Sequence, residues 1–282
     1  MGEVVVTRHA GLRAGQRDVR RWLSPLGSLV VPLATTAVII AIWEGAVRVF
    51  NIPIFLMPPP SAVATEIAQH SSLLFQQSLV TTNESLLAFG LSIVVGIPLG
   101  VVITASKTVE KIVYPLLVAS QAVPKVAIAP LLTIWLGFGL EPKVVVGALV
   151  AVFPIVIATV VGLQSVTTEM HYLGRSMGLD PVRMFFKIGL PQALPSIMGG
   201  LKVAIALAVV GAIVGEFTGA DRGLGYLLER SVGVLDTRQM FAALVCLVTV
   251  GVVLFGIVAW VETLVIRHPG AGNGSMRVRE SA

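Results

Sequence analysis

Long apolar stretches separated by short polar segments are the dominant pattern in this chain. Six of them are long enough to cross a bilayer core of about 30 Å, which takes roughly 20 helical residues. They are expected over residues 26–50, 84–105, 110–138, 142–165, 194–216 and 239–266. The third stretch contains Pro124 and Pro130, so we expect two helical pieces there. The pattern predicts an all-α, polytopic membrane protein with about six transmembrane helices.

The composition strengthens this prediction. Of the 282 residues, 55% are hydrophobic and only 12% are charged, where an ordinary soluble domain has about 25% charged residues. Such a chain has too little polar surface to cover a water-soluble core. Its single cysteine, Cys246, lies in an apolar run, which excludes an intramolecular disulfide and a zinc site built from cysteines.

The distribution of lysine and arginine predicts the orientation, because cytoplasmic segments carry an excess of both. With the N-terminus inside, thirteen of the 20 basic residues are cytoplasmic: Arg8, Arg13, Arg17, Arg20, Arg21, Lys107, Lys111, Arg175, Arg183, Lys187, Arg267, Arg277 and Arg279. Five are external, namely Arg48, Lys143, Arg222, Arg230 and Arg238, and Lys125 and Lys202 belong clearly to neither side. We therefore expect both termini in the cytoplasm.

This assignment divides the chain into three parts. A basic cytoplasmic leader is expected over residues 1–25, a transmembrane domain over 26–266, and a flexible cytoplasmic tail over 267–282. Two segments are expected to lie on the outer face without spanning. Residues 51–83 contain three successive prolines, after which Ser61 can cap a short helix. Residues 217–238 contain an amphipathic stretch between glycines.

Signatures of catalysis are missing from the sequence. It contains no phosphate-binding loop of the G-x-x-x-x-G-K-[ST] type, no H-E-x-x-H zinc motif and no G-x-S-x-G nucleophile motif. The four histidines lie in separate segments, which is poor spacing for metal ligands. We expect no catalytic residue, no metal and no cofactor, and we expect no interaction with nucleic acid.

Residues 165–191 are a polar segment with the signals of two short helices. Thr167 or Thr168 can cap the first helix, with Glu169 in its first turn, and Gly178 can end it. Asp180 followed by Pro181 is a second helix start. We call this segment the elbow and expect it to be compact and cytoplasmic. We expect its second helix to end at Pro191 and Pro195, before the fifth span.

The elbow also contains apolar residues that need a partner. Met177, Leu179, Met184 and Phe185 are expected on its exposed side. An exposed apolar face on a rigid segment is typical of a site that binds another protein. The sequence therefore predicts that a soluble partner binds the elbow.

The elbow resembles a motif of a known transporter family. Gly178, nine further residues and then Ile188-Gly189-Leu190-Pro191 match the second half of the E-A-A-x3-G-x9-I-x-L-P loop of ATP-binding-cassette (ABC) importer permeases. The E-A-A positions hold Tyr172, Leu173 and Gly174 and depart from that pattern. In order along the chain, PPPSAV, VGIPLGVVITAS, VPKVAIAPLLTIWLGFG, FFKIGLPQALPSIMGGLKVAI and VVGEFTGADRGLGYLL are similar to the nitrate/sulfonate/taurine branch of these permeases.

The resemblance implies the membrane subunit of a binding-protein-dependent type I importer, with a MetI-like fold, in the bacterial cytoplasmic membrane. It implies a dimer with a second permease copy, two cytoplasmic ATPase subunits and an external solute-binding protein. The implied cargo is a small solute, either an anion such as nitrate, a sulfonate or taurine, or a heteroaromatic vitamin precursor. PKVAIAPLLTIW is slightly closer to the latter group. The implied ATPase-coupling residues are Tyr172, Leu173, Gly174, Gly178, Leu179, Asp180, Arg183, Ile188, Leu190 and Pro191.

Polar residues within the spans are candidates for the translocation path. Lys125 follows Pro124 in the broken third span, and Gln121 lies one turn earlier on the same face. Broken helices at membrane depth usually border a cavity, so both residues can line the path; the alternative for Lys125 is an anchor or an inter-helix ion pair. Glu216 ends the fifth span and is either an outer-gate residue or binding-protein contact, or an acid at headgroup level.

Other residues have structural interpretations. Glu44 and Arg48 have the i, i+4 spacing of an ion pair, and Glu84 and Glu262 are expected near lipid headgroups. Four glycines in the fifth span are expected to allow close helix packing: Gly199, Gly200, Gly211 and Gly215.

Two other classes of membrane protein predict features that can be compared with this sequence. An ion-gradient-driven secondary transporter predicts paired carboxylates within the spans, inverted halves and no docking elbow, and only Glu84 and Glu216 hint at such a pair. A polytopic membrane enzyme predicts clustered His, Asp or Glu at one depth, and the spans lack such clusters.

Overall fold

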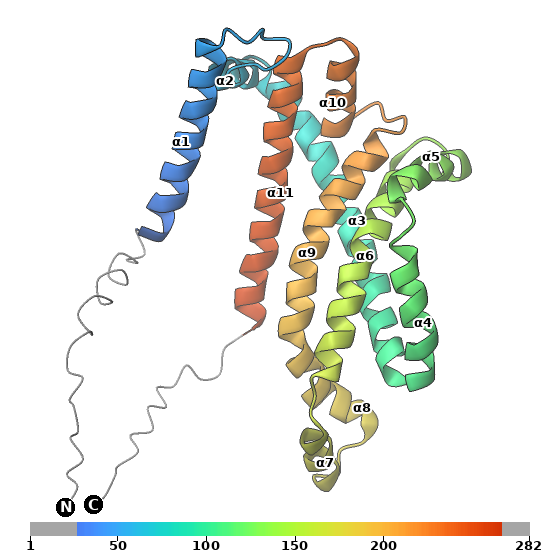
Figure 1. The fold of residues 1–282 in the computed structure, drawn as a ribbon. Coiled ribbons are helices and arrows are strands. Elements are labelled where there is room, and N and C mark those ends of the chain that lie inside the picture. The colour runs from blue at the N-terminus through green and yellow to red at the C-terminus, as the bar shows by residue number, and fades with distance from the viewer. Residues whose placement is uncertain (1–26, 267–282) are drawn as a thin grey trace, which may run out of the picture. The chain divides into compact units, whose positions relative to one another are not determined.

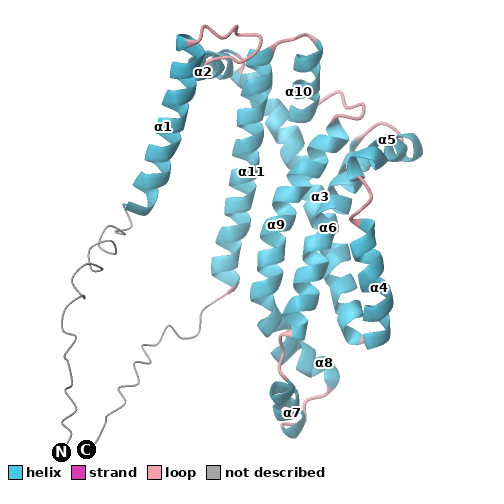
Figure 2. Ribbon diagram, in the orientation of Figure 1, coloured by secondary structure: helices cyan, strands magenta, loops and turns pink. Residues whose placement is uncertain are grey.

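The computed structural model describes residues 27–266, and these residues form helices joined by loops, without strands (Figure 2). The expected leader over residues 1–25 and tail over 267–282 lie outside the described residues. The chain divides into two compact units at Ala62 and Val63.

The first unit contains one membrane-length helix. Helix α1 (Gly27–Val49) matches the first predicted span, and the chain turns after it at Asn51, whose φ is 49°. Arg48 Nη2 lies 2.5 Å from Glu44 Oε1, which confirms the predicted ion pair. The N–H and hydroxyl groups of Ser61 also donate to the Glu44 carboxylate, at 3.0 and 2.8 Å. The predicted helix cap at Ser61 is therefore wrong, because these groups bond α1 instead.

Helix α2 (Pro60–Gln69) begins in the first unit, and the remaining helices belong to the second (Figure 1). They are α3 (Ser71–Ala105), α4 (Lys107–Ser120), α5 (Lys125–Leu136), α6 (Leu140–Gln164), α7 (Thr168–Ser176), α8 (Pro181–Met184), α9 (Leu190–Glu216), α10 (Leu224–Gly233) and α11 (Thr237–Val265). Of the described helices, five are long and apolar enough to span a membrane, or six if α4 and α5 count as one bent span. This confirms the predicted fold class.

Helix α3 is longer than the sequence pattern predicted. Residues 71–83 were expected in a non-spanning segment, whereas α3 begins at Ser71 and continues without a break to Ala105. These thirteen residues carry no charge, and five of them are apolar, so they are compatible with a continuous helix. Gln77 and Thr81 use their side chains to bind backbone groups of another segment, which stabilises this extension.

The third predicted span consists of two helical pieces, as expected. Helices α4 and α5 are bent by 93° relative to each other, and the break lies at residues 121–124, where Pro124 caps α5. Pro130 lies within α5 and does not interrupt it. The bend turns α5 across the end of the bundle that also carries α10 (Figure 1).

The core of the second unit lies between α3, α6 and α9. Ala88, Ala151, Ile155, Ala204 and Ala208 are buried together there, and the four alanines let the three helices approach closely. A Cβ added at Gly200, Gly211 or Gly215 would overlap α6, which confirms the predicted packing role of these three glycines. Gly199 faces open space instead.

Helix α9 is joined to α8 without an interruption. A π-helical turn over Phe185–Gly189 connects them, Pro191 lies in the first turn of α9, and Pro195 lies inside it. The prediction that these prolines end the second elbow helix is therefore wrong. Pro191 supplies no N–H group to this continuous helix, and the wider π-helical turn lies directly before it.

Candidate functional site

The first helix of the elbow ends in a Schellman motif. The N–H of Gly178 donates to Arg175 O at 2.9 Å, and the N–H of Leu179 donates to Gly174 O at 3.0 Å. Gly178 has a φ of 74°, a conformation that favours glycine. The sequence-based prediction that Gly178 ends this helix is thus confirmed. The positive φ at this position explains why a glycine is found there.

The start of α7 is held by polar contacts of Thr167 and Glu169. Thr167 occupies the N-cap position, but its side chain makes no capping hydrogen bond to the helix backbone. The backbone N–H of Glu169 and then the Thr167 hydroxyl hold the pKa of the Glu169 carboxyl below its usual range. An acid in the first turn also interacts favourably with the helix dipole. Local sequence thus defines both ends of α7.

The second elbow helix starts as predicted. Asp180 Oδ1 accepts the N–H of Arg183 at 2.7 Å, and Pro181 occupies the first helical position. The Arg183 guanidinium lies 3.5 Å from the same carboxylate, with both side chains largely exposed. The cap fixes the position of α8, whereas the exposed ion pair adds little stability.

The interior of the elbow packs around a glycine. A Cβ at Gly174 would lie 2.9 Å from Met184 Cε, 3.2 Å from Ile188 Cδ1 and 3.6 Å from Leu179 Cδ1. Leu179, Met184 and Phe185 are therefore half-buried, and the prediction that they form the exposed side is wrong. The missing side chain at Gly174 lets α8 and the π-helical turn pack against α7.

A different set of apolar residues faces outward. We call it the apolar knob: Tyr172, Leu173, Met177, Val182 and Phe186, whose exposed fractions lie between 52% and 69%. Of the predicted exposed residues, only Met177 belongs to it. Five large apolar side chains on one short, capped segment form a surface suited to a protein partner.

The elbow is tied to the helices on both sides of it. Gln192 Nε2 in α9 donates to Ser165 O at 3.1 Å, and Ser196 Oγ donates to Ala158 O of α6 at 2.9 Å. Gly162 packs directly on Ala193, where a Cβ would lie 2.8 Å from the Ala193 carbonyl oxygen. Because α6 and α9 are held together at this point, a force on the elbow acts on both helices.

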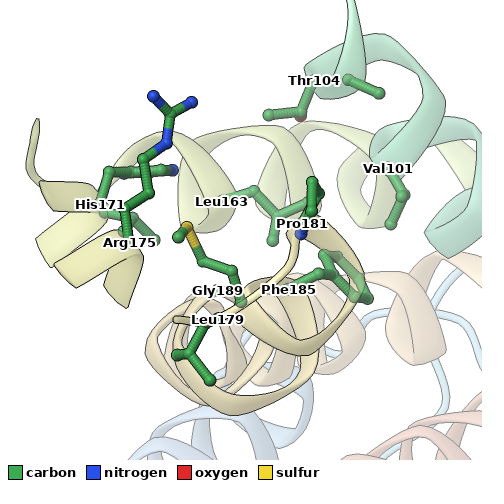
Figure 3. Close-up of a pocket in the computed structure, with 12 residues that line it drawn as sticks. Val101, Thr104, Leu163, His171, Arg175, Leu179, Pro181, Phe185 and Gly189 are labelled. Carbon is green, nitrogen blue, oxygen red and sulfur yellow. The ribbon is translucent and has the colours of Figure 1, made fainter. Parts of the chain in front are cut away.

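A cavity of about 450 Å³ separates the elbow from the nearest end of α3. Figure 3 shows Val101 and Thr104 of α3 on one side and Leu179, Pro181 and Phe185 of the elbow on the other. His171 and Arg175 of α7 also line it. The elbow therefore contacts α6 and α9 closely but has space on its α3 side.

The polar residues at the bend of the third span lie together. Lys125 Nζ donates a hydrogen bond to Gln121 Oε1, and Gln121 is exposed while Lys125 is half-buried. The bond joins the end of α4 to the start of α5, and its acceptor is a neutral amide rather than an acid on another helix. Their role in a path remains a prediction.

The third path candidate has a different environment. Glu216 is fully buried, and its carboxylate accepts hydrogen bonds from Thr81 Oγ1 at 2.6 Å and from the N–H of Gly225. It is enclosed by the protein and does not lie on an open surface of the subunit. Its carboxylate binds α3 and the start of α10 instead.

Two ion pairs inside the bundle were missed by sequence reasoning. Lys143 Nζ lies 2.7 Å from Glu84 Oε1, and Lys202 Nζ lies 2.7 Å from Glu262 Oε2. Glu84 and Glu262 were expected to contact headgroups, but each binds a lysine on another helix. The presence of acids and bases within the predicted spans could have indicated these pairs, because buried charges in membranes are normally paired.

Comparison with known sequences identifies relatives along most of the chain. The family model described as "binding-protein-dependent transport system inner membrane component" matches residues 92–267. The formylaminopyrimidine transport permease protein ThiX of Halalkalibacterium halodurans is 35% identical over 228 residues, covering 81% of this chain and 91% of that protein. The riboflavin transport system permease protein RibX of Chloroflexus aurantiacus is 34% identical, covering 89% and 93%. The taurine permease TauC of Escherichia coli is 26% identical, covering 88% and 90%.

Comparison with solved structures supports the same fold. The inward-facing MetNI methionine ABC transporter contains a chain that matches with a TM-score of 0.63 and 20% identity, covering 71% of this chain and 99% of that one. This confirms the predicted MetI-like helix arrangement.

Proposed function

Since the chain belongs to the family of binding-protein-dependent transport system inner membrane components, it is a permease subunit of an ABC importer, and we propose that its elbow binds a cytoplasmic ATPase subunit. The observation that carries this proposal is the apolar knob on a segment whose two helices are both capped. A rigid segment with exposed apolar side chains can enter a groove of a soluble protein and move with it.

The path of the movement follows from the chain's connectivity. The π-helical turn runs directly into α9, a helix of 27 residues, and α9 is fixed to α6 beside the elbow. ATP-driven closure of the ATPase subunits would therefore rock α9 and α6 together, as a two-state change biased by nucleotide. The subunit itself contributes binding and movement, and its partner contributes hydrolysis.

The ten coupling residues have three kinds of role in this proposal. Tyr172, Leu173 and Arg183 are exposed and contact the ATPase subunit. Gly174, Leu179 and Ile188 form the interior of the elbow. Gly178, Asp180, Leu190 and Pro191 shape its turns and its junction with α9.

We also propose that the elbow is cytoplasmic, with both termini on the same side. The basic residues Lys107 and Lys111 begin α4 at the elbow's end of the bundle, where Gln164 Nε2 donates to Glu110 Oε1 at 2.8 Å. Helices α5 and α10 lie at the opposite end (Figure 1). A second permease copy, a second ATPase subunit and an external solute-binding protein complete the proposed assembly in the bacterial cytoplasmic membrane.

We propose a small heteroaromatic solute as the cargo, and Gln121 and Lys125 as residues of the path. The relatives whose names give a formylaminopyrimidine or riboflavin are 34–35% identical to this chain, whereas the taurine permease is 26% identical. A hydrogen-bonding pair at a broken helix suits a solute with ring nitrogens and polar substituents. Because selectivity rests largely on the solute-binding protein, the path need only be compatible with the cargo.

The experiment is uptake by proteoliposomes that contain the permease and a candidate partner ATPase. The proposal expects uptake that requires internal ATP and the external binding protein, and that vanadate inhibits. Thermal-shift screening of that binding protein with a formylaminopyrimidine, riboflavin, taurine and an alkanesulfonate identifies the cargo. Uptake driven by an ion gradient without ATP would contradict the proposed function, and stabilisation by taurine or sulfonate alone would contradict the proposed cargo.

A further inference from the structure

Helix α10 is capped by side chains from two other helices. Gln77 Oε1 of α3 accepts the N–H of Gly223 at 2.6 Å, and Thr81 Oγ1 of α3 accepts the N–H of Leu224 at 2.8 Å. The N–H of Gly225 donates to Glu216 Oε2 at the end of α9. The first N–H groups of a helix have no partner within it. Here three of them are bonded by residues distant in sequence.

Two of these acceptors, Thr81 and Glu216, are also bonded to each other. The Thr81 hydroxyl accepts from Leu224 and donates to Glu216 Oε1 at 2.6 Å, and both Thr81 and Glu216 are fully buried. The Glu216 carboxyl also lies beside Glu84, whose other partner is Lys143 of α6. We call Gln77, Thr81 and Glu216 the outer clasp. Through Glu84 and Lys143 the same polar cluster reaches α6.

The two glycines at the start of α10 make the clasp possible. Gly223 has a φ of 113°, and a Cβ at this position would overlap the Glu216 carboxyl group. A Cβ at Gly225 would lie 2.7 Å from Glu216 Oε2. Any larger residue at either position would push the carboxylate away from the Gly225 N–H, from which it accepts a hydrogen bond.

The clasp and apolar packing together fix the position of α10. Its hydrogen bonds hold the N-terminal end of α10, while Leu227 packs against Leu74 of α3 and Ala242 and Ala243 of α11. Buried hydrogen bonds to a carboxylate are directional and strong, so they set an angle that apolar packing alone does not set. Helix α10 and the turn over residues 217–223 are thereby fixed to α3 and α9 as one rigid unit.

We propose that Thr81 and Glu216 are positioning residues for transport, which make α10 and the turn over residues 217–223 move together with α3 and α9. The inference rests on the proposed function, because α9 is the helix that continues the elbow. Movement that begins at the ATPase reaches the outer surface through α9. The hydrogen bond between Glu216 and the Gly225 N–H makes α10 move with α9. Without the clasp, α9 moves and α10 no longer follows.

Hydrogen exchange of the purified full-length chain tests the clasp directly. In Glu216→Ala, the amides of Leu224 and Gly225 exchange roughly tenfold faster or more, because the Gly225 N–H and the Thr81 hydroxyl lose their acceptor. Glu216→Gln keeps an acceptor for Gly225 and restores slow exchange. Glu229→Ala, which removes an exposed acid from the same helix, leaves the exchange unchanged. Wild-type exchange in Glu216→Ala would overturn the proposal.

The ratio of solute imported to ATP hydrolysed in proteoliposomes tests the positioning role. We expect this ratio to fall in Glu216→Ala and in Thr81→Val, and to recover in Glu216→Gln; an unchanged ratio in both variants would overturn the inference. If Glu216→Ala does not fold, Thr81→Val supplies the same test, because valine has nearly the same shape as threonine and removes only the hydroxyl group. Exchange needs no ATPase, so failure of the proposed function is seen separately, as loss of ATP-dependent uptake in the wild type.

Discussion

Lys143 of α6 and Glu84 of α3 form an ion pair 2.7 Å long, with only 9% and 3% of the two side chains exposed. Breaking such a pair leaves a buried charge without a partner, whereas replacing both members removes the charges together. The pair therefore joins two helices of the core and makes each of its members depend on the other.

We expect either Glu84→Gln or Lys143→Met alone to destabilise the protein by about 3–5 kcal/mol. The double variant should recover most of this loss, because no charge is then left unpaired. Thermal unfolding in detergent, with exposed Glu229→Gln as the control, measures the effect. A double variant less stable than both single variants would show that the loss of stability does not come from an unpaired charge.

At Gly178 we expect the side chain's shape to decide the outcome. Gly178→Val should uncouple ATP hydrolysis from uptake. An ordinary side chain at a φ of 74° destabilises the turn by about 1–2 kcal/mol, and a β-branched one destabilises it further. Gly178→Asn should retain coupling, since asparagine adopts this conformation readily and the space around the residue is open. Proteoliposome uptake and ATP hydrolysis are the measurements. Equal activity of the two variants would contradict the role of this turn.

Gly174 should tolerate only a small side chain. We expect Gly174→Ala to keep ATPase binding, because its Cβ displaces only the flexible end of Met184. Gly174→Leu should cost about 1–3 kcal/mol of local packing and displace α8. Co-purification of the ATPase with each variant measures the effect, and undiminished binding by Gly174→Leu would show that the elbow packs in another way.

Lys125→Met should alter transport without altering assembly. The substitution removes the ammonium group that binds Gln121, and the apparent affinity for solute should fall by roughly tenfold, the effect of losing about 1.4 kcal/mol. Lys107→Met, which removes a charge at the other end of α4, is the matched control. Uptake kinetics identical to those of the wild type would remove Lys125 from the path.

The sequence alone predicts those helix ends and spans that depend on interactions between residues close together in the chain. Gly178 and Asp180 end and begin helices through contacts with residues no more than a few positions away, so sequence alone predicts them. The apolar stretches predict spans for the same reason. The outer part of α3 was missed because polar residues interrupt its apolar ones, and the partners of Gln77 and Thr81 lie far along the chain.

Contacts between distant residues were beyond such reasoning. Glu84 and Lys143 are 59 positions apart, and Thr81 and Glu216 are 135 apart. No spacing rule links such residues, so Glu84 and Glu216 were expected near headgroups or the path. Similarly, the exposed face of the elbow depends on how α8 packs at Gly174, and periodicity within so short a helix does not reveal this packing.

The most direct test of the account is whether the apolar knob binds the ATPase. With the permease and the candidate partner ATPase co-expressed, we expect the two proteins to co-purify. Met177→Asp and Val182→Asp should each weaken this binding by roughly 100-fold or more, because an unpaired carboxylate in an apolar contact costs several kcal/mol. Val234→Asp, at an equally exposed position in the turn that follows α10, should leave it unchanged. Retention of the ATPase by both knob variants would contradict the central claim.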